Sequence, residues 1–169
     1  MISRNGFNVI FLGFLVSLGS CRSYSFTGTN LSEDLKTFSI ANFTMGTAGG
    51  PANMAFSFNE KLKEYYQRNT SLKFKSGDGD LHLEGTIISY ELTPVSATAG
   101  DKAAVNRLTI TVEVRYANKI KEEENFEREF SFYQDFPQEQ SLTQVEPNLV
   151  PKILDQLVLN IFNATAASW

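Results

Sequence analysis

Apolar and polar residues alternate most regularly between Arg107 and Ala117. A period of two is typical of a β-strand with one buried face and one face that is solvated or meets a partner. The predicted buried face consists of Leu108, Ile110, Val112, Val114 and Tyr116, and the other face of Arg107, Thr109, Thr111, Glu113 and Arg115. Residues 107–117 therefore predict a long strand of an antiparallel sheet.

Four further stretches predict strands. They are Leu35 to Phe43, Leu72 to Lys75, Leu81 to Leu92, and Phe126 to Tyr133, where Phe126, Phe130 and Phe132 share one face. The Asp-Gly step within residues 77–80 is typical of a hairpin turn, so we expect the second and third stretches to pair. A charged turn over residues 119–125 connects the two strands that flank it. Residues 93–106 read as a long loop of small residues, and loops of this length are often functional.

Two segments have the spacing of amphipathic helices. The first spans residues 52–68, with an apolar stripe of Met54, Phe58, Leu62 and Tyr65. The second carries Leu149, Ile153, Leu157 and Ile161. Because proline is tolerated only near the first helical turn, Pro147 and Pro151 predict that this helix begins between residues 146 and 151.

The order strand, helix, several strands, helix predicts the fold class. We expect an α+β domain built as a two-layer α/β sandwich, with two helices packed on one face of a mixed, mostly antiparallel sheet.

The segment before Cys21 has the pattern of a signal peptide. A single charge, Arg4, precedes an apolar stretch from Phe7 to Leu18, which is shorter than the ~20 residues of a spanning helix. Leu18-Gly19-Ser20-Cys21 resembles the lipobox of bacterial lipoproteins. This predicts a signal peptide over 1–20, a lipidated tether over 21–33 anchored through Cys21, and a domain over 34–169. A plain transmembrane anchor and an ordinary secretory signal stay open as alternatives, although the second leaves the lone cysteine unexplained.

Charge and motifs argue against several functions. Residues 1–20 contain one arginine and no acid, so the 15 basic and 19 acidic side chains of the whole chain leave the remainder mildly acidic. Nucleic-acid binders have the opposite footprint. The only histidine, His82, has no cysteine or second histidine with which to share a metal. Without a nucleophile elbow or phosphate loop, we expect no enzyme, no cofactor and no nucleic-acid partner.

Several segments together resemble the LptE family. They are residues 24–28, 36–40, 79–81, 84–85, 89–90, 106–112, 126–136, 156–158 and 161–163, which cover nearly the whole domain behind the lipobox. The resemblance implies a lipoprotein of Gram-negative bacteria on the periplasmic side of the outer membrane. Such proteins plug and help to assemble the β-barrel protein LptD and assist lipopolysaccharide insertion into the outer leaflet.

The resemblance implies two partners, an LptD-like barrel and lipopolysaccharide. Cations can pair with lipid A phosphates, so the candidates for lipopolysaccharide binding are Lys73, Lys75, Lys102, Arg107 and Arg115. Each of them can equally be an ordinary surface charge. The alternative function is that of a periplasmic lipoprotein that activates or inhibits an envelope enzyme such as a cell-wall synthase.

Overall fold

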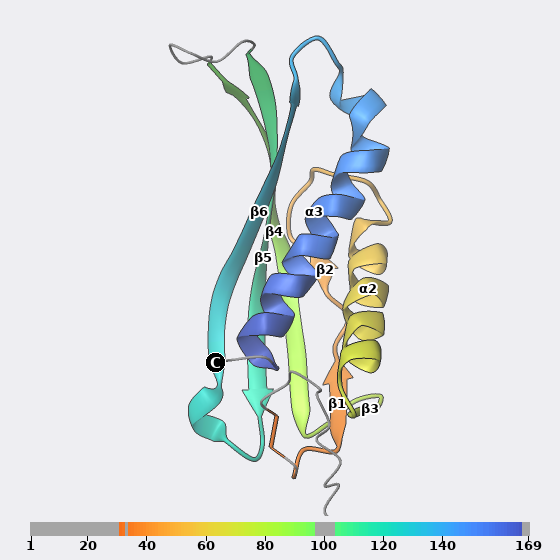
Figure 1. Cartoon of the computed structure of the whole chain (residues 1–169), viewed down its shortest axis with the longest axis vertical. Helices are drawn as coiled ribbons and strands as arrows, with labels where there is room; N and C mark the ends of the chain where they lie inside the picture. Colours follow the sequence, from red (N-terminus) through yellow and green to blue (C-terminus); the bar gives the residue numbers. More distant parts are fainter. Residues whose placement is uncertain (1–30, 33, 97–103, 167–169) are drawn as a thin grey trace, which may run out of the picture.

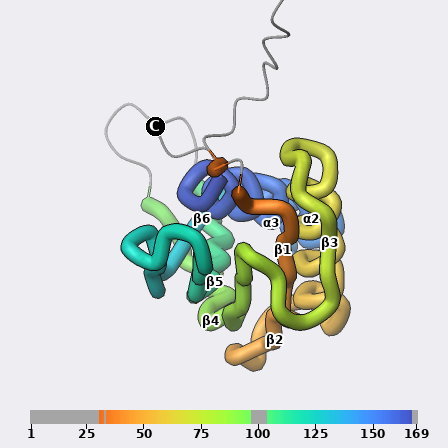
Figure 2. Tube along the Cα trace, turned by 90° about the horizontal axis from the view of Figure 1, so that it is seen from below, coloured from red at the N-terminus to blue at the C-terminus, as the bar shows by residue number. Residues whose placement is uncertain are grey.

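A six-stranded sheet and two helices form two layers in the computed structural model, which describes residues 31–32, 34–96 and 104–166. Figure 1 shows both helices on the same side of a long, twisted sheet, and Figure 2 shows the other side of the sheet uncovered by helices. The α+β sandwich predicted from the sequence is confirmed.

The sheet contains three short strands and three long ones. They are β1 (Thr37–Ile40), β2 (Thr44–Met45), β3 (Lys73–Phe74), β4 (Leu81–Val95), β5 (Val105–Asn118) and β6 (Phe126–Pro137). Their order is β3-β1-β4-β5-β6, and β2 also pairs with β4. The long strands β4, β5 and β6 pair antiparallel, whereas β1, β2 and β3 form parallel pairs. The sheet is therefore mixed, and its long ladders are antiparallel.

The predicted hairpin at residues 77–80 is wrong. Strand β1 lies between β3 and β4 and pairs in parallel with both. The connecting segment crosses over β1, where the Gly79 N–H donates to Ser39 Oγ at 2.9 Å. A Cβ on Gly79 would lie 2.7 Å from the Ser39 nitrogen, so this crossing needs a glycine. The Asp-Gly step thus allows a close approach to β1 and makes no hairpin.

Helix α2 (Met54–Asn69) confirms the first predicted helix and corrects its stripe. Met54, Phe58 and Leu62 are buried as expected, but the fourth buried position is Tyr66. Tyr65 is only half-buried and packs edge-on against Phe162 of the second helix. A step of four residues, continued from Leu62, keeps Tyr66 on the face toward the sheet.

Helix α3 (Leu142–Thr165) begins before the predicted start, so Pro147 and Pro151 lie inside it. Its N-cap is Ser141, whose N–H donates to Gln144 Oε1 at 3.1 Å. This capping box satisfies an otherwise unpaired donor and stabilises a turn that the prolines alone would not predict. Among the described residues, no helix is long and apolar enough to cross a membrane.

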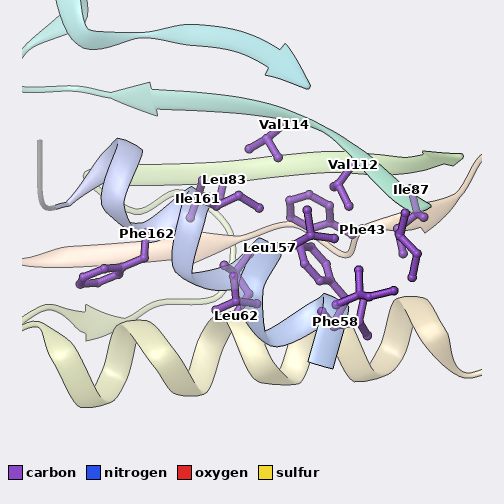
Figure 3. Packing of buried hydrophobic residues seen from close by; sticks show 14 of the residues in the cluster. Phe43, Phe58, Leu62, Leu83, Ile87, Val112, Val114, Leu157, Ile161 and Phe162 are labelled. Atoms are coloured by element: carbon purple, nitrogen blue, oxygen red, sulfur yellow. The ribbon is translucent and has the colours of Figure 1, made fainter. Parts of the chain in front are cut away.

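The core fills the space between the helices and the sheet. Figure 3 shows side chains of α2, α3 and the central strands pointing toward one another. Every residue of the predicted apolar face of β5 is buried. At one end of this core, the Tyr66 hydroxyl contacts Thr165 Oγ1, and the Tyr116 hydroxyl donates to the Thr165 carbonyl at 3.2 Å. These polar contacts connect α2, α3 and β5.

The predicted loop at residues 93–106 is shorter than expected. Thr93, Pro94 and Val95 pair with Arg107, Asn106 and Val105, so the two strands continue beyond the helices. Residues 97–103 lie outside the described residues. In Figure 1 this hairpin projects at the end of the molecule opposite β1 and β3.

Candidate functional site

The cationic residues predicted to bind lipopolysaccharide lie at separate places. Arg107 and Arg115 both project from β5 on the face that the helices leave open, eight residues apart in register. That spacing corresponds to roughly 26 Å along a strand. Lys73 and Lys75 belong to the opposite edge of the sheet, at and just after β3. Cys21 and Lys102 lie outside the described residues. The candidate residues that the structure describes therefore do not form a single site.

Arg107 is held in a fixed position near the projecting end of the sheet. Its Nε and Nη2 donate to the two carboxylate oxygens of Asp135, at 2.7 and 2.9 Å. Its guanidinium carbon also lies 3.7 Å from the centre of the Tyr133 ring. A forked pair of this kind, stacked on an aromatic ring, fixes the plane of the guanidinium. Arg107 thus presents its remaining N–H groups in one defined direction.

The Arg107–Asp135 pair changes the titration of both groups. The hydrogen bond from Arg107 holds the pKa of the Asp135 carboxyl below its ordinary value. The same hydrogen bond raises the pKa of Arg107, so the guanidinium stays charged at every accessible pH. An anion that approaches Arg107 meets a full positive charge with a carboxylate beside it.

Arg115 lies between two carboxylates on the same open face. Its Nε donates to Glu127 Oε2 and its Nη1 to Glu84 Oε1, both at 3.1 Å. The side chain is 61% exposed. With a carboxylate on each side, Arg115 is a weaker candidate for binding a phosphate than Arg107.

A hollow of about 260 Å³ lies beside Arg115 on the open face of the sheet. Gly85 forms its floor, and Glu84, Glu113 and Glu127 stand among its walls. A Cβ on Gly85 would lie 2.1 Å from the Glu113 carbonyl oxygen, so the neighbouring strand requires this glycine. Because Gly85 pairs with Val114, its missing side chain belongs to the core face, next to the Phe43 ring, and only its backbone borders the hollow.

Lys73 and Lys75 are exposed side chains two residues apart. Neither takes part in an ion pair within the part of the chain that the structure describes. The Lys75 N–H donates to the Phe38 carbonyl at 2.8 Å, which fixes the backbone. Both ammonium groups can contact an anion from solvent at the end of the molecule where β1 begins.

The one histidine lies in a row with a serine and a glutamate. Its Nδ1 is 2.7 Å from Ser39 Oγ, and its Nε2 is 3.7 Å from Glu84 Oε2. Ser39, however, is completely buried beneath the segment that crosses β1, and its Oγ accepts the Gly79 N–H. In this arrangement His82 contacts a buried serine that already accepts a backbone hydrogen bond. No group of three or more possible metal ligands occurs among the described residues.

Sequence reasoning identified the cations but missed their partners. Asp135, Tyr133, Glu84 and Glu127 become neighbours of the arginines only through the pairing of β4, β5 and β6. A usable signal was present in the charged turn at residues 119–125. A hairpin centred on residue 121 of this turn places Arg115 opposite Glu127, as observed, whereas a centre at 122 would place it opposite Glu129.

Comparisons with known proteins agree with this fold. The family model LptE, described as lipopolysaccharide-assembly, matches residues 35–165. A crystal structure of the rare lipoprotein B from Shewanella oneidensis is similar with a TM-score of 0.52 and 15% identity, covering 75% of this chain and 92% of that one. A solution structure of an uncharacterized lipoprotein B from Nitrosomonas europaea has a TM-score of 0.50 and 14% identity, covering 75% and 79%. No curated protein matches the sequence.

Proposed function

The chain belongs to the LptE family of lipopolysaccharide assembly, and from this premise we propose that it plugs and helps to assemble an LptD-like barrel in the outer membrane. In this role it assists the insertion of lipopolysaccharide into the outer leaflet. The observation that carries the proposal is the extent of the family match, which begins before β1 and ends with the last residue of α3. Both layers of the domain are therefore included.

The chemistry of the domain surface supports a place inside a barrel. The lumen of a transmembrane barrel is polar, whereas its outer wall is apolar. The described domain buries its apolar side chains between the two layers and leaves only four large apolar residues well exposed: Phe56, Leu92, Ile120 and Tyr133. A long domain with a polar surface suits a water-lined lumen better than a lipid surface.

Lipidation at Cys21 would hold the domain at the membrane. Attachment of several acyl chains makes such an anchor effectively permanent, because each buried CH₂ contributes ~0.8 kcal/mol. Replacing Cys21 by Ala should leave an unprocessed or soluble protein. An unmodified thiol in the intact mass of the membrane-bound wild type would contradict the proposal.

Arg107 is the described residue best placed to contact lipopolysaccharide phosphates. The fork to Asp135 uses two of the five guanidinium N–H groups and leaves three for an anion. Residues 97–103, which include Lys102, connect the strands next to it. Lys73 and Lys75 form a second candidate contact at the opposite end, where β1 begins.

Co-purification tests the proposal directly. The lipoprotein is purified from outer membranes with an affinity tag at its C-terminus, and its partners are identified. An LptD-like barrel and bound lipopolysaccharide are the expected result. Recovery of a peptidoglycan enzyme in place of the barrel would favour the alternative, regulation of an envelope enzyme.

The hairpin loop offers a second test. Replacement of residues 96–104 by Asn-Gly keeps the pairing of Val95 with Val105 and removes the connection beyond it. We expect the far-ultraviolet circular dichroism to be unchanged while barrel recovery or resistance to large antibiotics falls. Full recovery together with an intact envelope would show that the loop is a passive connection.

A further inference from the structure

The open face of the sheet has a charge pattern with one unmatched position. Across β4, β5 and β6 most opposite charges lie together: Arg107 pairs with Asp135, and Arg115 with Glu84 and Glu127. Glu113 breaks this pattern, because its direct neighbour on β6 is Glu129. Like charges at directly opposite positions destabilise a sheet. In the described part of the chain, neither carboxylate takes part in an ion pair.

The unmatched pair lies beside the hollow over Gly85. Glu113 is one wall of that hollow, and its other neighbour across the sheet is Thr86 on β4, which is uncharged and also lines the hollow. Four carboxylates lie around this hollow, those of Glu84, Glu113, Glu127 and Glu129. The only described guanidinium among them is that of Arg115. A volume of about 260 Å³ has room for the end of a long side chain.

We propose that the open sheet face docks a basic, polar wall of the barrel, with a partner lysine or arginine entering the hollow over Gly85 to pair with Glu113 and Glu129. The inference rests on the proposed function and adds the docking face and the chemistry of its partner. Cations of the partner compensate the like-charged pair that the isolated domain leaves unmatched. Among the residues described, Tyr133 is the only large apolar side chain well exposed on this face, so polar contacts dominate the docking.

The same charges exclude another occupant of this part of the face. Lipid A phosphates carry negative charge, and Glu113 and Glu129 repel them. Lipopolysaccharide therefore contacts the domain away from Glu113 and Glu129, at the Arg107 end of this face or beside Lys73 and Lys75. The acidic part of the sheet face and these cationic positions have separate roles.

Glu113→Lys tests the proposal, because we expect it to maintain or raise the stability of the isolated chain but to weaken its binding to the barrel. In the isolated chain the new lysine faces Glu129, so the melting temperature should equal or exceed that of the wild type. In the complex the lysine meets a basic wall, so recovery of the barrel from outer membranes should fall about tenfold or more. Glu113→Gln should give a smaller loss of the same sign.

Glu123→Lys is the matched control. It makes the same change of charge at an exposed residue of the 3-10 turn, Glu122–Glu124, outside the sheet face. Barrel recovery with this variant should equal that of the wild type. Both variants are compared at equal expression, in the full lipidated chain.

The outcomes separate this inference from the function on which it rests. A wild-type chain that recovers no barrel overturns the function and this inference together. Normal recovery with Glu113→Lys overturns only the docking face. The docking face is also overturned if Glu123→Lys reduces barrel recovery as much as Glu113→Lys does. The same holds if Glu113→Lys lowers the melting temperature enough to explain its reduced recovery.

Discussion

Single residues set the geometry of the open sheet face, and Gly85 is the most constrained of them. Its missing side chain lets the Glu113 carbonyl and the Phe43 ring approach the β4 backbone. The residue is therefore required for the packing of β4 against β5 and the Phe43 ring. A position of this kind cannot be recognised in the sequence, where Gly85 interrupts an otherwise ordinary strand pattern.

Gly85→Ala should destabilise the domain by about 3 kcal/mol or more, the upper part of the range for overpacked positions, because the clash is with backbone. Gly77→Ala is the comparison. Gly77 has φ +89°, and a Cβ added there would meet nothing within 4 Å, so only backbone strain of about 1–2 kcal/mol applies. Urea unfolding of both variants measures the difference. Equal losses would show that the strands part easily at Gly85.

Asp135 gives a pH prediction at the same scale. Its pKa is lower in the folded chain than in the unfolded one, because Arg107 hydrogen-bonds to it. The contribution of the pair to stability is therefore present above the unfolded value of ~3.9 and is lost as the pH falls through the folded pKa. Carboxyl NMR should show Asp135 titrating below ~3.9, and Arg107→Leu should raise that midpoint. An unchanged midpoint would exclude the forked pair in solution.

Among the elements, α3 supplies the widest apolar surface of the helical layer. Nine of its residues are buried, including Leu157, which is completely inaccessible to solvent. Its two prolines lie in the half that follows the Ser141 cap, and the burial of Leu149 and Val150 in the core keeps that half in place. Tertiary packing here overrides the low helix propensity of proline.

Leu157→Asp should destabilise the domain by several kcal/mol, because an unpaired charge would be buried in the core. That is a large part of a typical stability of ~5–15 kcal/mol. Lys152→Asp, at an exposed position of the same helix, is the control and should change the melting temperature little. A melting temperature of Leu157→Asp equal to that of the wild type would contradict the packing of α3.

Periodicity predicted the long elements well and the short ones poorly. The alternation along residues 107–117 identified both faces of β5, because a central strand is buried on one face only. Strand β1 obeyed no such rule, since Ser39 is buried under the crossing at Gly79. The start of α3 depended on Ser141 and Gln144, a signal that the two prolines obscured. The candidate cations could be named, but their partners depended on a register that residue spacing alone did not specify.

At the scale of the whole molecule, two buried tyrosines, Tyr66 and Tyr116, and the partly buried Tyr90 connect the sheet to the helices. Burial raises the pKa of Tyr66 and of Tyr90, and raises the pKa of Tyr116 to about 12. An unfolded tyrosine ionises near pH 10, whereas these residues stay neutral in the folded chain. Their contribution is thus complete below pH ~10 and is lost progressively as the pH rises above it.

We therefore expect the free energy of unfolding to fall as the pH rises from about 10 toward about 12, by up to ~1.4 kcal/mol per pH unit for each fully linked tyrosine. Tyr66→Phe should reduce this slope, because it removes one of the linked hydroxyl groups. Urea unfolding at a series of pH values measures the slope in the wild type and in the variant. A slope unaffected by Tyr66→Phe would show that Tyr66 does not report on global unfolding.

The position of β1 between β3 and β4 limits the order in which the chain can fold. Thr37 pairs with Lys73, and Phe38 with Leu81, which lie 36 and 43 residues later in the chain. The β4–β5–β6 meander, in contrast, closes through neighbouring segments, which is entropically cheaper and faster. The meander can therefore assemble before β1 is locked between β3 and β4. The strand that comes first in the sequence is then among the last parts of the sheet to become ordered.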